Sequence, residues 1–264
     1  MRAEIVCVGT ELLLGDIVNT NAHYLSKQLA SLGVEVYHQS VVGDNEGRLQ
    51  ETLQTAIGRS DMVITIGGLG PTKDDLTKES ICSLFDLSME LHEPSMEKIK
   101  ERYEKIGQEM TENNIKQAMV PAGCEVFFNN HGAAPGGVVT NGDKKVVFLP
   151  GPPSEFCPMV DEYVVPYLQT LSGKVFYSTT LREFGIGESV LETKLEDILD
   201  GSNPTAALYA KDGEVEIRIT ASAHDKETAK QMADKVVDAI CSRVGEFIYG
   251  RDVSSYAEAV VHML

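Results

Sequence analysis

Short apolar runs alternate with amphipathic stretches through the first part of the chain. The runs at 3–8, 34–42 and 62–66 have the length and apolar content of buried strands, and a stretch with apolar residues at helical spacing follows each of them. This alternation predicts a mainly parallel sheet with helices on both faces. Ligands of such sheets bind outside the carboxyl ends of the strands. The segments that follow the strands are therefore the first candidates for a site.

The pattern continues with a polar amphipathic stretch at 93–118, a hairpin at 137–149 and a helix that ends near residue 170, and it changes near residue 172. Beyond that point strands are predicted at 175–183, 205–211, 214–220 and 246–249, and helices at 186–199 and 225–241. The order β-α-β-β-α-β is typical of a ferredoxin-like fold. We therefore predict an α/β chain with a three-layer αβα domain at 1–172 and a small α+β domain, ferredoxin-like or KH-like, at 173–252.

The most informative segment lies at 64–77, where the third apolar run leads through a Gly-Gly-Leu-Gly sequence at 67–70 into the adjacent carboxylates Asp74 and Asp75. Glycine accepts a positive φ and lets a ligand approach the main chain closely. The run from Thr72 to Asp75 fits a capping box, which predicts the start of a helix, and a helix N-terminus suits a phosphate group. Carboxylates beside a phosphate site suit a divalent cation. This segment predicts a phosphorylated ligand and a metal ion.

Three further segments follow predicted strands. Residues 9–16 follow the first strand, Asp44 follows the second, and the run at 150–155 follows the second strand of the hairpin. Because carboxyl ends of parallel strands meet at one edge of a sheet, we expect these segments to gather in one crevice with the glycine segment. Asp44 fits equally well as the N-cap of the helix that follows it. Lys78 reads as an ordinary solvated lysine.

The charge balance limits the partners. The chain has 264 residues and a formal net charge of −17, a field that repels nucleic acid in the absence of a basic run. An anionic ligand must then be held by backbone amides, a few lysines or a metal ion. No apolar run approaches the roughly 18 residues that span a bilayer, and no signal-peptide pattern precedes the first strand. The dispersed cysteines fit neither a disulfide framework nor a zinc site, so we expect a cytoplasmic protein.

Several motifs in the same order resemble one family. The runs at 9–15, 19–21, 67–75 and 149–155 resemble the N-terminal part of the competence/damage-inducible (CinA) family, and 184–189 with Asn203-Pro204 resemble its middle domain. The resemblance implies a molybdopterin-binding-like first domain that hydrolyses ADP-ribose to AMP and ribose 5-phosphate with a divalent metal, as in pyridine nucleotide recycling. It also implies functional roles for the acids at Asp44 and Asp75, with Asp74 and Thr72 at more variable positions.

The resemblance also bears on the end of the chain. The Glu-Ser-Cys-Thr-Gly-Gly signature of the family's nicotinamide mononucleotide deamidase domain does not occur in this sequence. Deamidase activity is therefore not expected from these residues. Residues 253–264 read as the start of a truncated C-terminal domain or as a linker.

We therefore expect a metal-assisted pyrophosphatase site with Mg²⁺, Mn²⁺ or Co²⁺ as cofactor. The expected metal ligands are Asp44, Asp75 and Glu11, and the expected catalytic residues are Asp44, Asp74 and Asp75. The expected substrate-binding residues are Thr10, Glu11, Gly15, Asn19, Asn21, Gly67, Gly68, Gly70, Pro71, Thr72, Lys73, Gly151, Pro152, Pro153 and Glu155.

Two alternative functions stay open. The first is a module that binds a nucleotide or molybdopterin without chemistry and serves a deamidase domain. The second is nucleotidyl transfer to molybdopterin. In each case we expect a small-molecule ligand, no nucleic acid or membrane partner, and a homodimer formed through the second domain.

Overall fold

The structure is a computed structural model that describes residues 1–253 and 255–263. The chain divides into two compact units: Met1–Ala30 with Val34–Tyr167, and Ser31–Gly33 with Leu168–Leu264. Each unit has its own sheet and its own apolar core. Ser254 and Leu264, which fall in the C-terminal segment predicted at 253–264, lie outside the described residues.

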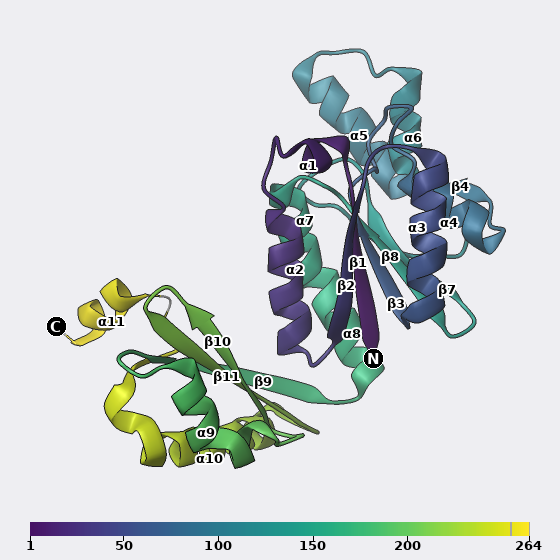
Figure 1. Cartoon of the computed structure of the whole chain (residues 1–264). Helices are drawn as coiled ribbons and strands as arrows, with labels where there is room; N and C mark the ends of the chain where they lie inside the picture. Colours follow the sequence, from purple (N-terminus) through teal and green to yellow (C-terminus); the bar gives the residue numbers. More distant parts are fainter. Residues whose placement is uncertain (254, 264) are drawn as a thin grey trace. The chain divides into compact units, whose positions relative to one another are not determined.

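The first unit is built on a six-stranded sheet (Figure 1). The strands of the first unit are β1 (Arg2–Val8), β2 (Glu35–Val42), β3 (Met62–Ile66), β4 (Met89–Leu91), β5 (Met119–Pro121), β6 (Glu125–Phe127), β7 (Gly136–Asn141) and β8 (Lys144–Leu149). The helices are α1 (Thr10–Leu14), α2 (Thr20–Ser31), α3 (Glu46–Arg59), α4 (Thr77–Phe85), α5 (Glu93–Ile106), η1 (Glu112–Asn114), α6 (Ile115–Ala118), α7 (Pro153–Met159), η2 (Val160–Val164) and α8 (Val165–Ser172). A small separate sheet pairs β4 with β5.

The strand order of the large sheet is β2-β1-β3-β8-β7-β6. β2, β1, β3 and β8 run parallel, and β7 and β6 extend the sheet antiparallel, which confirms the predicted mainly parallel α/β fold. The chain passes from β1 to β2 on one side and then crosses to β3 on the other side of β1. The order therefore reverses between β1 and β3, and a crevice is expected beyond their carboxyl ends.

Helices cover both faces of this sheet (Figure 1). α3 and α4 pack on one face, where Leu49, Leu53 and Ile81 join sheet residues such as Val6 and Val63 in one core. α2 and α7 cover the other face. All residues of β3 and all but the first of β1 are buried, as expected for central parallel strands. The core therefore holds the ends of β1 and β3 in fixed positions.

Four local differences from the sequence prediction affect the site. The helix predicted at 93–118 ends at Ile106, because Gly107 adopts a left-handed conformation with φ 65° and stops it. The short strands β4, β5 and β6 were not predicted, since three-residue strands carry too little pattern. α4 begins at Thr77, so the capping-box sequence forms a turn before the helix. Finally, the short helix α1 forms directly after β1, where no helix was predicted.

The second unit has a four-stranded antiparallel sheet with helices on it. Its elements are β9 (Val175–Glu183), α9 (Glu188–Leu199), β10 (Thr205–Lys211), β11 (Glu214–Ala223), α10 (Lys226–Val244), η3 (Gly245–Phe247), β12 (Ile248–Arg251) and α11 (Tyr256–Met263). The strand order is β10-β11-β9-β12, and every neighbouring pair is antiparallel. This confirms the predicted β-α-β-β-α-β unit.

One carboxyl group lies on the apolar face of this second sheet. Leu181 and Glu183 point to the same side of β9 because side chains alternate along a strand, and Glu183 pairs with the inward-facing Val215. The Glu183 side chain is fully buried, and neither of its carboxyl oxygens has a hydrogen-bond partner among the described residues. Burial raises the pKa of Glu183 to about 7.

At pH values above the pKa of Glu183, we expect Glu183→Gln to stabilise the protein by about 2–3 kcal/mol, because glutamine places no charge in the apolar core. The Glu183 carboxyl titrates near 4.5 in the unfolded chain and near 7 in the fold, so the folded state binds more protons between these values and the stability of the wild type falls as the pH rises through that window. Thermal unfolding of the whole chain at about pH 5 and about pH 8 measures the difference.

Glu192→Gln, at an exposed glutamate of α9, is the matched control and should follow the wild-type profile. A Glu183→Gln profile that also follows the wild type would contradict a buried, unpaired carboxyl.

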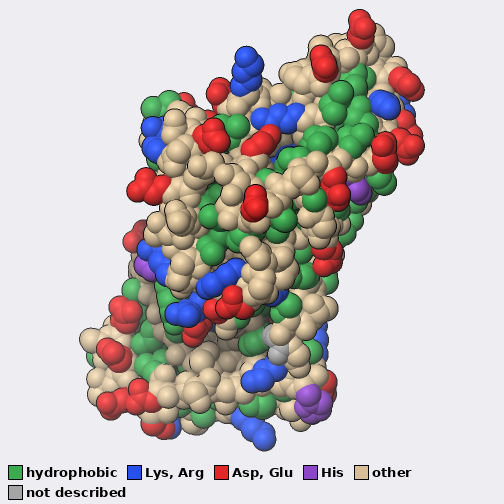
Figure 2. Space-filling model, turned by 90° about the vertical axis from the view of Figure 1, so that its right-hand side faces the viewer, with side chains coloured by type: hydrophobic (Ala, Val, Ile, Leu, Met, Phe, Trp, Pro, Cys, Tyr) green, Lys and Arg blue, Asp and Glu red, His purple; other side chains and the backbone are tan. Residues whose placement is uncertain are grey.

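The surface mixes charges of both signs. On the face shown in Figure 2, Lys and Arg side chains are interspersed with Asp and Glu side chains. Within residues 1–253 and 255–263, no helix has the length and apolar content needed to cross a bilayer.

Candidate functional site

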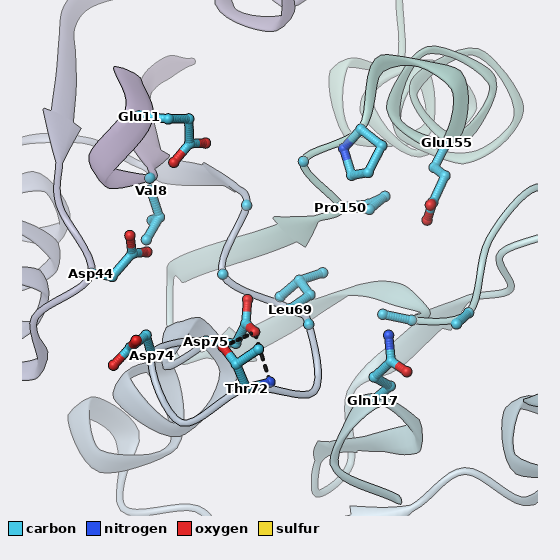
Figure 3. A pocket seen from close by; sticks show the side chains of 18 of the residues that line it. Val8, Glu11, Asp44, Leu69, Thr72, Asp74, Asp75, Gln117, Pro150 and Glu155 are labelled. Atoms are coloured by element: carbon cyan, nitrogen blue, oxygen red, sulfur yellow. Dashed lines mark hydrogen bonds between the residues drawn. The ribbon is translucent and has the colours of Figure 1, made fainter. Parts of the chain in front are cut away.

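A cavity of about 520 Å³ lies at the carboxyl ends of β1, β3 and β8, where the strand order reverses (Figure 3). We call it the phosphate cavity, after the ligand that the sequence leads us to expect there. Segments far apart in the sequence meet there, as expected from the positions of the strand ends. Its lining residues are Val8, Gly9, Glu11, Asp44, Gly67, Gly68, Leu69, Gly70, Thr72, Asp74, Asp75, Arg102, Gln117, Ala133, Ala134, Pro150, Gly151, Pro152 and Glu155.

The glycine loop after β3 lines this cavity and carries free backbone amides. Gly67 has φ 99°, and a Cβ there would clash with the carbonyl oxygen of Val8, so only glycine fits this close approach to β1. The N–H of Gly67 continues the sheet by donating to Leu149 O at 2.9 Å. The N–H groups of the next three residues, 68–70, have no acceptor among the described residues. Successive free amides of this kind form an anion-binding site.

Asp75 is held in a turn below this loop. Its Oδ2 accepts hydrogen bonds from the Thr72 N–H at 2.9 Å and the Thr72 hydroxyl at 2.6 Å (Figure 3). The same carboxylate packs over Gly70, where a Cβ would collide with Oδ2. The other oxygen, Oδ1, has no donor among the described residues. Asp75 therefore offers one free oxygen in a fixed position.

Asp44 is held in the same way by a different threonine. Its Oδ2 accepts from the Thr10 N–H at 2.9 Å and from the Thr10 hydroxyl at 2.7 Å, and no described donor reaches Oδ1. The N-cap of α3 is the next residue, Asn45, whose side chain accepts from the Arg48 N–H at 3.1 Å. The capping role considered for Asp44 is thus wrong, and its carboxylate belongs to the cavity.

Glu11 and Glu155 add two more carboxylates. Glu11 folds back over Gly9, where a Cβ would collide with its carboxylate. Glu155 lies on the side of the cavity opposite Glu11 (Figure 3), and its carboxylate accepts a hydrogen bond from Asn129 Nδ2 at 2.7 Å. Asp74 lines the outer rim with an exposed side chain and makes no hydrogen bond to another described residue. Among the lining residues, the acids outnumber the single cationic side chain, Arg102.

This excess of carboxylates bears on the expected metal. Nowhere in the described part of the chain do three or more His, Cys, Asp or Glu side chains gather as a metal site. The free Oδ1 atoms of Asp44 and Asp75 are hard oxygen donors, and Mg²⁺ is usually held by one or two carboxylates together with substrate phosphates. The donor set therefore fits a cation that is completed by a phosphorylated ligand.

Lys78 is buried, so its reading as a solvated lysine is wrong. Only 1% of its side chain is exposed, and Nζ donates to the carbonyls of Lys116, Gln117 and Met119 at 3.0, 3.0 and 2.7 Å. Burial lowers the pKa of Lys78 to about 8. This side chain ties α4 to α6 and so positions Gln117, which lines the phosphate cavity.

The same segment braces the glycine loop from outside. Lys116 Nζ donates to Thr72 O at 3.0 Å, and Asn113 Nδ2 donates to Pro71 O at 3.4 Å. Lys116 also pairs with Glu79 at 3.3 Å. The turn that holds Asp75 is therefore fastened to α6 and η1 by contacts some forty residues apart in the sequence.

A second cavity of about 480 Å³ adjoins the first and shares Val8, Glu11, Gly151 and Pro152 with it. We call it the apolar cavity, because most of its other lining side chains are apolar. These further residues are Cys7, Leu12, Ile17, Val18, Asn19, Thr20, Asn21, Ile66 and Pro153. Asn21 Nδ2 donates to Gly151 O at 2.6 Å and holds the Pro-Gly-Pro-Pro segment, and the Asn19 side chain accepts from Ala22 N at 3.1 Å at the start of α2.

The predicted residues divide into three groups. The phosphate cavity brings together Glu11, Asp44, Gly67, Gly68, Gly70, Thr72, Asp74, Asp75, Gly151, Pro152 and Glu155. Asn19, Asn21 and Pro153 line the apolar cavity. Thr10, Gly15, Pro71 and Lys73 line neither; Thr10 acts through Asp44, Gly15 ends α1 in a left-handed conformation, Pro71 accepts from Asn113, and the Lys73 side chain is exposed.

Sequence reasoning missed the lining residues Arg102, Gln117, Ala133 and Ala134. They come from α5, α6 and the loop before β7, which follow no parallel strand. No strand exit or glycine motif marks them, so no signal in the sequence would have found them.

Comparisons with known proteins agree with this architecture. Residues 4–170 match the family described as "Probable molybdopterin binding domain", and residues 178–250 match the "Damage-inducible protein CinA KH domain". A "CinA-like protein" from Dictyoglomus turgidum is 52% identical over 265 residues, covering 100% of this chain and 64% of the relative. A solved structure of CinA from Thermoplasma acidophilum is 34% identical with a TM-score of 0.56, covering 62% of this chain and 97% of that chain.

The two matched ranges follow one another along the chain, the first in the first unit and the second in the second unit. The chain spans 64% of the length of the Dictyoglomus relative, so the activity of such longer proteins is not thereby established for it. The chain belongs to the CinA family, with a first unit of the molybdopterin-binding type and a second unit of the CinA KH type.

Proposed function

We propose that the first unit hydrolyses the diphosphate of ADP-ribose to AMP and ribose 5-phosphate with a divalent cation. The proposal is carried by one observation: Asp44 and Asp75 line the same cavity, and each is held through one oxygen by a threonine N–H and hydroxyl. Residues 68–70, whose amides are free, line this cavity as well. Fixed amides suit a phosphate, and carboxylates beside them suit a cation that bridges to it.

The residues of the chain divide the work of hydrolysis. The amides of residues 68–70 would hold the oxygens of one phosphate and stabilise the charge that builds there in the transition state. The oxygen of a water molecule would attack the phosphorus of the phosphate that the amides hold, and the bond from this phosphorus to the bridging oxygen would break. The other phosphate would leave with the bridging oxygen, so that both products are phosphate monoesters. Glu11, at the boundary of the phosphate and apolar cavities, would accept the proton of the attacking water.

Asp44 and Asp75 would hold the cation through their free oxygens. When bound, a divalent ion neutralises phosphate charge and lowers the pKa of a water molecule. The excess of acids over Arg102 in the lining supports this role, because a diphosphate would otherwise be repelled by the carboxylates around it. Mg²⁺, Mn²⁺ and Co²⁺ are the ions to test.

The expected result is formation of AMP when purified protein is incubated with ADP-ribose and one of these ions. Activity should disappear with a chelator and return when the metal is restored, because without the cation the carboxylates of the cavity repel the diphosphate. Product chromatography measures AMP and ribose 5-phosphate together. Failure to form AMP with all three ions would overturn the proposal.

The family description supports two other functions. Because residues 4–170 match a molybdopterin-binding family, nucleotidyl transfer to molybdopterin would use the same glycine loop and acids. Release of pyrophosphate from ATP in the presence of molybdopterin, without hydrolysis of ADP-ribose, would favour that reaction. Tight nucleotide binding without a metal and without any product would favour a binding module.

A further inference from the structure

A third cavity of about 400 Å³ meets the phosphate cavity at Arg102, which lines both. Lys98 and Lys105 line it from α5, and His131 and Gly132 line it from the loop before β7. We call it the basic cavity. The apolar cavity does not share Arg102. The phosphate cavity therefore shares lining residues with the apolar cavity and with the basic cavity, and the character changes from apolar through acidic to basic across the three.

The basic character comes from a segregation of charge on α5. Lys98, Arg102 and Lys105 are four and three residues apart and so share one side of the helix. The acids Glu97 and Glu104 do not line the cavity, and only Glu101 does. In a chain with a net charge of −17, such a concentration of cations beside a phosphate site is unexpected for a solvated helix.

The wall between the two cavities is held by a buried side chain. Asn129 is 3% exposed, its Oδ1 accepts from the N–H groups of His131 and Gly132 at 3.0 and 2.7 Å, and its Nδ2 donates to Glu155 at 2.7 Å. Lys98 Nζ donates to the Asn129 carbonyl and lies 5.3 Å from the Phe128 ring centroid. The loop and α5 are thus locked together, and the basic cavity is a built feature of the fold.

The cation at the junction has no partner in the described part of the chain. No ion pair or hydrogen bond of Arg102 to another described residue occurs, although a guanidinium carries five donors. Lys105 has only an exposed pair with Glu101 at 3.6 Å, which is worth little. Both charges are therefore available to an anion of a ligand.

The order of the cavities gives the ligand a direction. A heterocycle suits the apolar cavity, and the diphosphate suits the free amides and acids next to it. The sugar beyond the diphosphate then extends toward Arg102 and the basic cavity. This direction follows only if the phosphate cavity holds a diphosphate, so the inference rests on the proposed function.

We propose that the basic cavity is a subsite for an anion on the distal sugar of a nucleoside diphosphate sugar. Arg102 and Lys105 bind a terminal phosphate of that sugar, and the protein prefers a substrate that carries one over plain ADP-ribose. Charge-assisted hydrogen bonds to phosphate are stronger than neutral ones, and a planar guanidinium matches phosphate oxygens in pairs.

Three ligands test the subsite: ADP-ribose, its 1″-phosphate and its 2′-phosphate. The two phosphates carry the same added charge at opposite ends of the molecule. Binding is measured by calorimetry with metal present in the Glu11→Gln variant, which lacks the proposed proton acceptor and should not turn over the ligand. The value of kcat/KM is measured separately with the wild type and metal. The 1″-phosphate should bind about tenfold more tightly than ADP-ribose, whereas the 2′-phosphate should gain nothing.

Lys105→Ala should reduce this gain severalfold, and Arg102→Ala should abolish it. Lys100→Ala is the matched control, since Lys100 is an exposed cation of the same helix that lines neither cavity. Equal binding of the three ligands, a gain with the 2′-phosphate, or a gain that survives in both variants overturns the subsite. Tighter binding of the 1″-phosphate without hydrolysis of any ligand overturns only the proposed hydrolysis, and absence of all binding overturns both.

Discussion

Asp75→Asn is expected to lower kcat/KM for ADP-ribose by about 10²–10³-fold, the cost typical of losing one electrostatic contact to a reacting group. The amide oxygen of asparagine can still accept from the Thr72 N–H and hydroxyl, so the turn should keep its geometry. What disappears is the negative charge on the free oxygen that would hold the cation. Steady-state kinetics at several metal concentrations measures the loss, and unfolding stability should stay within about 0.5 kcal/mol of the wild type.

Asp74→Asn is the matched control for this experiment. Asp74 is the adjacent residue, but its side chain is exposed at the outer rim, and no described residue hydrogen bonds to it. It was expected among the catalytic residues from sequence, and we now expect its change to leave kcat/KM nearly intact. Asp44→Asn should behave like Asp75→Asn. A large loss in Asp74→Asn beside a small loss in Asp75→Asn would reverse the roles that we assign.

Lys78→Met is expected to destabilise the protein by about 3–5 kcal/mol, because several buried carbonyls lose their donor at once. Methionine has nearly the same length, so the effect reports the lost hydrogen bonds to Lys116, Gln117 and Met119 and no large cavity. Denaturant unfolding measures the change. KM for ADP-ribose should rise as well, because α6 carries Gln117 into the phosphate cavity.

Lys73→Met is the matched control, since this lysine of the same segment is exposed and lines neither cavity. The pH dependence supplies a second readout. The folded pKa of Lys78 is about 8 against 10.5 for the free side chain, so the unfolded state binds more protons between these values and wild-type stability rises with pH across them. Lys78→Met should lack this rise. Equal stability of the two variants at neutral pH would contradict the buried role.

The position of the phosphate cavity followed from the sequence, because the carboxyl ends of parallel strands lie at one edge of the sheet. Short apolar runs identified β1, β3 and β8. The glycine run marked the loop in which the backbone at Gly67 comes close to the carbonyl oxygen of Val8. The role of Asp44 was not decidable in the same way. Asp44 and Asn45 are both good caps, and only the contact with Thr10 across the β1–β2 edge removes Asp44 from the helix.

Lys78 and Arg102 show the opposite case. Nothing in the sequence around Lys78 indicates that its side chain is buried, since its neighbours Thr77 and Glu79 are polar. The three carbonyls that accept from Lys78 lie about forty residues away in the chain. Arg102 belongs to a helix rich in both charges, where a solvated surface is the ordinary interpretation. Both roles depend on how α4, α5 and α6 pack beyond the parallel strands, in a region whose short strands escape pattern recognition.

By itself the sequence determined the two-unit α/β architecture, the family, and the edge of the sheet where the glycine loop and the acids meet, because these depend on local periodicity and on chain geometry near each strand end. Only the tertiary structure decided which oxygen atoms stay free, which cations are buried or unpaired, and how three cavities of different character adjoin. Those properties arise from contacts between segments distant in the chain, and local pattern carries no record of such contacts.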